Sequence, residues 1–276
     1  MQIRPLVVRS ANSPILAETE PPTVAVHNPA ASSPFLLLGD HAGNRIPAAL
    51  GGLGLDATER TRHIAWDIGV ADLGVRLADR IGASFIHQVY SRLVIDCNRR
   101  PGAPDSIPAI SDETAIPGNQ GLDTVQAELR AAAFFEPYQR TISADIDRRT
   151  MAGLETVLVA LHSFTPRMGG FDRPWQVGIL HDGGNDRFAR AMLAALREDP
   201  DLNVGDNEPY SMDTIDFTIP FHAYPRMLPY VEVEIRQDQL ADGAGINEWS
   251  ARLEKALRAA LASSRSFSLP RDASRV

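Results

Sequence analysis

Six short runs of apolar residues alternate along the chain with segments of helical periodicity. The runs are nearly continuous in Val, Ile and Leu, as is typical of strands covered on both faces. They occupy residues 35–40, 83–90, 92–97, 156–164, 175–182 and 229–235. Because strands that alternate with helices build layered α/β folds, we predict a three-layer α/β sandwich with a mostly parallel or mixed central sheet. Active sites of such sheets lie just beyond the carboxyl ends of the strands.

Apolar residues spaced three and four positions apart predict helices between the strands. The clearest sets are Val70, Leu73 and Leu77; Leu122, Val125 and Leu129; Tyr138, Ile142 and Ile146; and Trp249, Leu253, Leu257 and Leu261. Pro137 precedes the third set, so we expect the helix to kink or restart there.

The two ends of the chain differ from its middle. Residues 1–22 are polar and proline-bearing and predict a loose N-terminal arm, and residues 264–276 predict a C-terminal tail. No repeat or low-complexity linker divides the rest. We therefore predict a single domain over 1–276, which is long enough to bury a core without disulfides.

The net charge and the cysteine content exclude several classes of protein. A formal net charge of −8 argues against a nucleic-acid partner and against attraction to anionic membranes. No apolar run approaches the about 18 residues of a membrane span. The one cysteine cannot form an internal disulfide, and no long apolar stretch of a secretory signal is present near the N-terminus. These features predict a cytoplasmic protein; its oligomeric state is not specified.

Polar residues gather at the ends of the predicted strands. They are Asp40, His41, Asp96, Asn98, Arg99, His162, Glu232 and Glu234, with Arg92 at the start of one strand. Imidazoles and carboxylates from several strands suit a mononuclear zinc hydrolase, because zinc takes nitrogen and oxygen ligands and keeps one position open for water. Arginines suit the binding of a substrate carboxylate. The sequence has no H-E-x-x-H, no G-x-S-x-G, no phosphate-binding loop and no convincing dinucleotide fingerprint.

Six blocks of sequence resemble a known family. "DHAGNRIP", "DIGVADL", "SRLVIDCNRRP", "LHSFTP", "NEPYS" and "VEVEIRQD" occur in this order between residues 35 and 262. Together they resemble the N-formylglutamate amidohydrolase family, particularly its predicted branch, which is distantly similar to zinc carboxypeptidases and aspartoacylases. The resemblance implies a zinc-exopeptidase-like fold.

The resemblance also implies roles for individual residues. His41 matches the first zinc ligand and His162 the last. Asn98 and Arg99 match the pair that holds a substrate carboxylate, and Arg92 is placed to bind substrate or to polarise the scissile carbonyl.

The general base lies in the block "VEVEIRQD". Glu232 and Glu234 are two residues apart and face the same side of a strand, so spacing alone does not choose between them. The Ile-Arg that follows Glu234 favours Glu234 as the residue that matches the base.

One position departs from the carboxypeptidase pattern. That pattern needs an acid three residues after His41, and this sequence has Asn44, whose neutral amide is a poor zinc ligand. Asp67 is the predicted replacement, although aspartate is also favoured as a helix N-cap. Asn44 itself and His222 are the alternatives.

These features predict a metal-dependent amidohydrolase that removes a short N-acyl group from an acidic amino acid, with N-formyl-glutamate as the named substrate. Zinc or another divalent metal on His41, Asp67 and His162 would activate water. Glu234 would accept the proton and pass it to the departing amine. Two alternatives remain: a deacylase or peptidase acting on another acyl-amino acid, and a non-catalytic sensor of an acidic metabolite.

Overall fold

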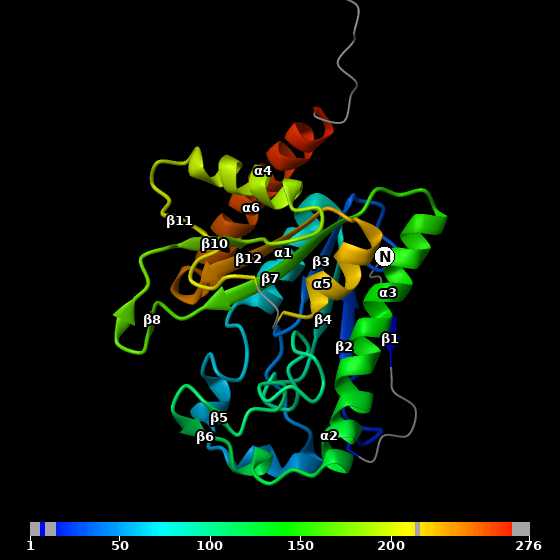
Figure 1. Cartoon of the computed structure of the whole chain (residues 1–276), viewed down its shortest axis with the longest axis vertical. Coiled ribbons are helices and arrows are strands. Elements are labelled where there is room, and N and C mark those ends of the chain that lie inside the picture. Colours follow the sequence, from blue (N-terminus) through cyan, green and yellow to red (C-terminus); the bar gives the residue numbers. More distant parts are fainter. Residues whose placement is uncertain (1–5, 9–14, 213–215, 267–276) are drawn as a thin grey trace, which may run out of the picture.

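A mixed eight-stranded sheet forms the centre of the molecule (Figure 1). This computed structural model describes residues 6–8, 15–212 and 216–266. In spatial order the strands are β1 (Leu6–Val8), β2 (Val24–His27), β4 (Ser84–Gln88), β3 (Phe35–Gly39), β7 (Val157–Phe164), β12 (Tyr230–Arg236), β10 (Val177–Leu180) and β11 (Val204–Asp206). The four central strands, from β4 to β12, are mutually parallel. Antiparallel pairs join β1 to β2, β2 to β4 and β12 to β10.

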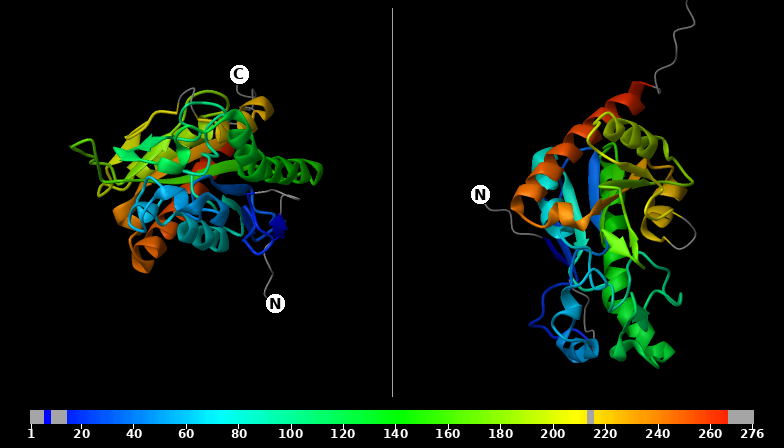
Figure 2. Two further views of the ribbon diagram at one scale, coloured as in Figure 1. Left: turned by 90° about the horizontal axis from the view of Figure 1, so that it is seen from below. Right: turned by 90° about the vertical axis from the view of Figure 1, so that its left-hand side faces the viewer.

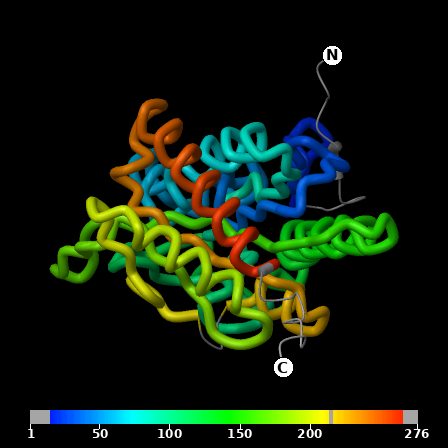
Figure 3. The backbone as a smooth tube through the Cα atoms, turned by 90° about the horizontal axis from the view of Figure 1, so that it is seen from above, coloured from blue at the N-terminus to red at the C-terminus, as the bar shows by residue number. Residues whose placement is uncertain are grey.

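Helices cover both faces of the sheet (Figure 2). They are α1 (Val70–Ile81), α2 (Thr124–Arg130), α3 (Glu136–Met151), α4 (Arg187–Arg197), α5 (Thr218–Ala223) and α6 (Gly243–Ser266). Figure 3 shows α6 between α1 and α4 on one face, and α3 and α5 pack on the other. The predicted three-layer sandwich with a mixed sheet is confirmed.

Shorter elements complete the fold. Two small hairpins, β5 (Ile110–Ser111) with β6 (Thr114–Ala115) and β8 (Arg167–Met168) with β9 (Phe171–Asp172), stand apart from the main sheet. Short 3-10 helices lie at η1 (Ala48–Gly54), η2 (Glu59–Thr61), η3 (Pro117–Asn119), η5 (Tyr224–Arg226) and η6 (Gln237–Leu240).

Strand β12 shows how the sheet separates its two faces. Val231, Val233 and Ile235 join the apolar core beneath α1, α4 and α6. Glu232 and Glu234 alternate with them and therefore point to the opposite face. The expectation that both glutamates face the same side is met.

The prediction of a strand at 92–97 is wrong. This segment is a buried loop whose amide groups donate to carbonyl groups of other loops, for example Arg92 to Ala65 and Asp96 to Ser106. Its apolar side chains, Leu93, Val94 and Ile95, fill the core on the α3 side. The segment is therefore apolar because it is buried, and it does not pair with a neighbouring strand.

The helix around Pro137 continues without a break, but its hydrogen-bonding pattern changes just before the proline. A π-helical turn, η4 (Ala131–Phe135), joins α2 to α3, and Pro137, which has no N–H, is the second residue of α3. The stripe on α2 faces outward, with Val125 62% and Leu129 36% exposed.

Parts of the predicted arm and tail lie outside the described residues. Within the arm, β1 pairs with the edge of the sheet, whereas 1–5 and 9–14 are not described. Helix α6 extends to Ser266, and the tail beyond it is not described. The single domain stays a prediction. Among the described helices, none is long and apolar enough to cross a membrane.

Candidate active site

The carboxyl ends of β3, β7 and β12 meet at a cavity of about 660 Å³. Strand β3 ends at Gly39 and delivers Asp40 and His41 to this edge of the sheet. His162 lies near the end of β7, directly opposite Glu234 of β12 in the parallel register. His41, His162 and Glu234 all line the cavity.

Three buried side chains form the centre of the site. His41, Asp67 and His162 each offer one ligand atom, and these atoms lie within 4.8 Å of one another. Asp67 Oδ2 is 3.5 Å from His41 Nδ1 and 2.9 Å from His162 Nδ1. The structure therefore brings together the three residues that the sequence proposed as a group.

Asp67 reaches the cluster from the loop that precedes α1. Its backbone N–H donates to the carbonyl of His41, which fixes this loop beside the end of β3. The N-cap residue of α1 is Gly69, and no side chain caps the helix. The alternative role of Asp67 as a helix cap is therefore not seen, and its carboxylate faces the two imidazoles.

Each imidazole of the cluster also contacts a second carboxylate. His41 Nε2 lies 2.7 Å from Asp96 Oδ1, and His162 Nε2 lies 3.4 Å from Asp40 Oδ2. Thr218 donates its hydroxyl to the other oxygen of Asp40 at 2.5 Å. Both rings thus turn Nδ1 toward Asp67 and Nε2 toward a carboxylate, which is the pattern that orients histidine ligands in metal sites.

The cluster has the properties that a divalent cation requires. His41 Nδ1 is buried and has no hydrogen-bond partner among the described residues. Burial and Arg92 lower the pKa of His41, but Asp96 and Asp67 outweigh them and raise it. Burial likewise lowers the pKa of His162, while hydrogen bonds to Asp40 and Asp67 raise it well above its usual value. The carboxylates that stabilise a proton on each of the two imidazoles would equally stabilise a metal ion. Binding of the metal ion would release those protons.

Two buried glutamates lie beside the cluster. Glu232 and Glu234 each keep one carboxyl oxygen without a hydrogen-bond partner in the described part of the chain. Burial raises the pKa of Glu234 to about 7, against the opposing charges of His162, His41 and Arg92. Burial, and next the charge of Asp216, raise the pKa of Glu232 well above its usual value. A carboxyl group with a pKa near neutrality can both accept and return a proton at physiological pH.

Arg92 contacts two carboxylates of the site. Its Nε and Nη2 donate to Asp96 Oδ2 at 3.0 and 2.6 Å, and its Nη1 lies 3.5 Å from Asp67 Oδ1. The guanidinium therefore ties the carboxylate behind His41 to the carboxylate within the cluster. Its charge is compensated within the protein.

Asn98 and Arg99 bind a carboxylate of the chain itself. Asn98 Nδ2 and Arg99 Nη1 both donate to Asp216 Oδ1, at 3.1 and 3.0 Å. Arg99 Nε donates to Asp105 at 2.8 Å, and Asn98 Oδ1 accepts the amides of Phe217 and Thr218 at the start of α5. Both residues line the cavity, and in this structure their donors engage aspartates of the protein.

The family model for N-formylglutamate amidohydrolase matches residues 33–241. The chain belongs to this family. Its members are hydrolases that act on amide bonds, so the N-formylglutamate amidohydrolase resemblance read from the six sequence blocks is confirmed.

Solved structures resemble this chain to different degrees. A gene product of Agrobacterium tumefaciens is 37% identical, with a TM-score of 0.88 over 91% of this chain and 99% of that chain. An N-formylglutamate amidohydrolase from Ralstonia eutropha shares the fold at 19% identity, with a TM-score of 0.62 over 88% and 99% of the two chains. An aspartoacylase family protein from Mesorhizobium loti matches at 16% identity and a TM-score of 0.37, over 90% and 65%. No curated protein matches the chain.

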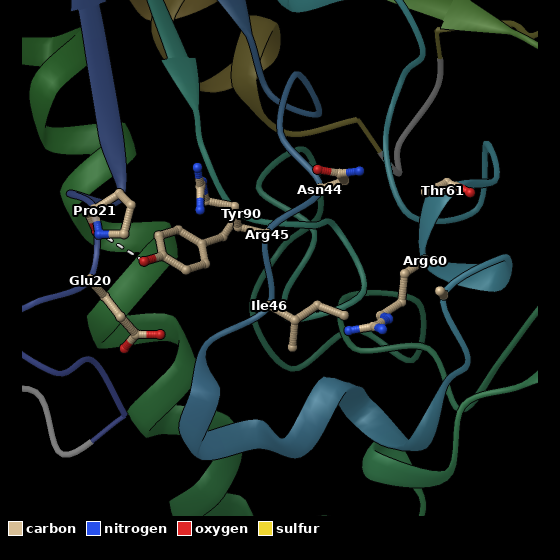
Figure 4. Close-up of a pocket in the computed structure, with 9 residues that line it drawn as sticks. Glu20, Pro21, Asn44, Arg45, Ile46, Arg60, Thr61 and Tyr90 are labelled. Atoms are coloured by element: carbon tan, nitrogen blue, oxygen red, sulfur yellow. Dashed lines mark hydrogen bonds between the residues drawn. The ribbon is translucent and has the colours of Figure 1, made fainter.

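The two alternative ligands of this amidohydrolase lie away from the cluster. Asn44 lines a separate pocket together with Arg45, Arg60 and Tyr90 (Figure 4). His222 is fully buried; its Nε2 lies 2.7 Å from Gln139 Oε1 and its Nδ1 3.4 Å from Ser143 Oγ. Burial lowers the pKa of His222 to about 4. Its contacts are those of a neutral histidine that joins α5 to α3.

Sequence reasoning left several residues of the cavity without a role. Asp40 and Asp96 were noted only as polar strand ends, and their partnership with His162 and His41 has no signature in sequence spacing. Tyr210, which lines the cavity, lies within the block "NEPYS". That block was the signal that could have found it.

Proposed function

We propose that this amidohydrolase is metal-dependent and removes a formyl or other short acyl group from the nitrogen of an acidic amino acid, with N-formyl-glutamate as the substrate. The observation that carries the proposal is the buried group of His41, Asp67 and His162 beside Glu234. Membership of the N-formylglutamate amidohydrolase family supports the choice of substrate. The partner is accordingly a small N-acyl amino acid, and we retain the cytoplasm as the proposed location.

His41, Asp67 and His162 would hold zinc or another divalent metal, because they present two imidazoles and a carboxylate within reach of one ion. When bound, such a metal supplies a water of pKa near ~7 and polarises the amide carbonyl. Asp96 orients the imidazole of His41, and Asp40 lies 3.4 Å from Nε2 of His162. Arg92 holds Asp96 and Asp67 in place.

Glu234 is the proposed proton carrier. It would take the proton from the attacking water and return it to the amine nitrogen as the C–N bond breaks, since one carboxyl can serve first as base and then as acid. The charges that act on Glu234 come chiefly from His162, Asp67, His41 and Arg92, so its carboxyl faces the cluster. Glu232 also reaches the cluster, with its Oε1 3.9 Å from His162 Nε2, but the largest charge acting on its pKa is that of Asp216.

Removal of the metal is expected to abolish hydrolysis of N-formyl-glutamate. Dialysis against a strong chelator should lower the rate of formate release to background, and stoichiometric zinc or another divalent ion should restore it. Metal content measured on the same samples provides the control. Full activity in thoroughly demetallated protein would contradict metal dependence. Tight substrate binding with bound metal and no turnover would instead favour the sensor.

Replacement of Asp96 by Asn is expected to weaken metal binding by about 10–100-fold, as is typical when the acceptor behind a histidine ligand is lost. Asp96 Oδ1 lies 2.7 Å from His41 Nε2, and Asp96 Oδ2 accepts hydrogen bonds from Nε and Nη2 of Arg92. Competition with a chromogenic chelator measures the affinity directly. Asp105→Asn is the matched control, because Asp105 pairs with Arg99. Equal affinities of the two variants would contradict the orienting role of Asp96.

A further inference from the structure

The arginines near the cavity differ in how far carboxylates of the protein neutralise their charge. N-formyl-glutamate carries two carboxylates, one on the α-carbon and one on the side chain. Arg92 already pairs with Asp96 and Asp67, and Arg99 pairs with Asp105 and Asp216. A second substrate carboxylate therefore calls for a cation that the protein has not already neutralised.

Arg173 is such a cation. It follows the β8–β9 hairpin and is 8% exposed. Among the described residues, no carboxylate lies within ion-pair distance of its guanidinium. The acceptors of its guanidinium among these residues are uncharged: Nη1 donates to Tyr210 Oη at 2.9 Å and to the Thr165 carbonyl at 3.4 Å, and Nη2 donates to Met168 Sδ at 3.1 Å.

Other buried arginines of the chain are better satisfied. Arg130 donates to two backbone carbonyls and to Asn119 Oδ1, at 2.7–3.0 Å. Arg149 donates to three backbone carbonyls and to the hydroxyl of Thr156. A guanidinium has five N–H donors, and a thioether is a weak acceptor. Arg173 is thus a buried charge with poor compensation, which is costly unless an anion joins it.

The guanidinium of Arg173 lies directly behind the wall of the catalytic cavity. It is 4.8 Å from the ring centroid of Tyr210 and 5.7 Å from that of Phe164. That cavity is lined by Tyr210, Phe164, Thr165 and Met168, which include the side-chain partners that Arg173 has in the described part of the chain. A ligand that displaces the thioether of Met168 from Nη2 would therefore meet the positive charge.

Tyr210 extends this charge into the cavity. Its oxygen accepts from Arg173, so its own hydroxyl hydrogen is left to donate to another acceptor. Tyr210 is 40% exposed. Tyr210 and Glu234 line the same cavity, so the phenol connects Arg173 to the cavity that holds the proposed base.

We propose that Arg173 and Tyr210 together bind the side-chain carboxylate of the substrate and so select an acidic amino acid. This inference rests on the proposed hydrolysis of N-acyl amino acids. The phenol donates one hydrogen bond to the carboxylate, and the guanidinium supplies the opposite charge and further donors. Arg173 is then the specificity residue.

The test compares N-formyl-glutamate with N-formyl-glutamine, which has the same shape without the charge. With metal-loaded protein, we expect the wild type to prefer glutamate in kcat/KM. Arg173→Met should lower kcat/KM for N-formyl-glutamate by about 10–100-fold, the loss typical of a hydrogen bond to a charged group. The value for N-formyl-glutamine should change little, so the preference disappears.

Two further variants separate recognition from structure. Arg173→Lys keeps the charge and should retain part of the preference for glutamate. Tyr210→Phe keeps the ring against which Arg173 packs and removes only the donor, so it should lower the glutamate rate selectively even if Arg173→Met does not fold. Arg167→Met is the matched control on the same hairpin, because Arg167 is exposed and pairs with Asp172.

The possible failures are distinguishable. Equal losses for the two substrates would show that Arg173 only holds the hairpin, and a wild type without preference would show that the cavity does not select a charge. Either result overturns the inference and leaves amide hydrolysis intact. Release of no formate from either substrate by metal-loaded wild type would reject the proposed function itself, and the inference with it.

Discussion

Replacement of Glu234 by Gln is expected to lower kcat for N-formyl-glutamate by about 10²–10⁴, the usual contribution of a general acid–base residue. Glutamine keeps the size of the side chain but cannot accept the proton of water. Because Glu234 lies outside the group of His41, Asp67 and His162, the bound metal should remain at wild-type stoichiometry. Initial rates together with metal analysis of the same protein measure both quantities.

Glu232→Gln is the matched control for this experiment. It changes the neighbouring buried carboxyl on the same face of β12. A larger loss in this variant than in Glu234→Gln would assign the proton transfer to Glu232. Near-normal turnover in both variants would remove the carboxyl pair from the mechanism.

The same residue determines an expected pH dependence. Glu234 must be deprotonated to accept a proton, so kcat/KM should fall as the pH drops below its pKa. Burial raises that pKa to about 7 in the protein without a cation. A divalent ion nearby favours the carboxylate, so the acidic limb of the metal-loaded enzyme should lie at or below pH 7. This limb should be absent from the residual activity of Glu234→Gln.

Replacement of Asp67 by Ala is expected to lower metal affinity by more than the about 10–100-fold typical of residues that only orient a ligand. The change removes the one carboxylate of the cluster, so only the two neutral imidazoles of His41 and His162 remain to hold a divalent cation. Chelator competition measures the affinity, and circular dichroism of the variant checks that the fold is kept.

Asn44→Ala provides the contrast to Asp67→Ala. Asn44 holds the position at which the carboxypeptidase pattern has an acid, but it lines the separate pocket near Arg60. We expect its replacement to leave metal affinity unchanged. If Asn44→Ala released the metal and Asp67→Ala did not, the proposed ligand set would be wrong.

The sequence predicted the layers of the fold because buried parallel strands require long apolar runs. Strands β3, β4, β7 and β10 lie within predicted runs, and β12 extends one residue beyond its run, to Arg236. The same logic failed at 92–97, where Leu93, Val94 and Ile95 are buried in a loop. Hydrophobicity reports burial, and hydrogen bonding to a neighbouring strand is a separate property that a single sequence does not display.

The residues of the candidate site were predictable where their roles are tied to a recognisable local sequence pattern. Histidines that end strands and paired acids on a strand are visible as patterns, and Asp67 could be named because the expected acid after His41 was missing. No such sequence pattern identifies Arg173. Its significance lies in the absence of a nearby carboxylate among the described residues, which only the packing of distant segments reveals.

The alternation along β12 also constrains how the protein folds. Val231, Val233 and Ile235 occupy one apolar core, and Glu232 and Glu234 face the cavity. A slip of one residue relative to β7 would exchange the side chains on the two faces of the strand. Two carboxyls would then lie in that core, and three apolar side chains would lie in the polar cavity. The cost of burying unpaired carboxyls makes such a mispaired strand unstable. Glu232 and Glu234 thus also disfavour incorrect alignment of β12 during folding.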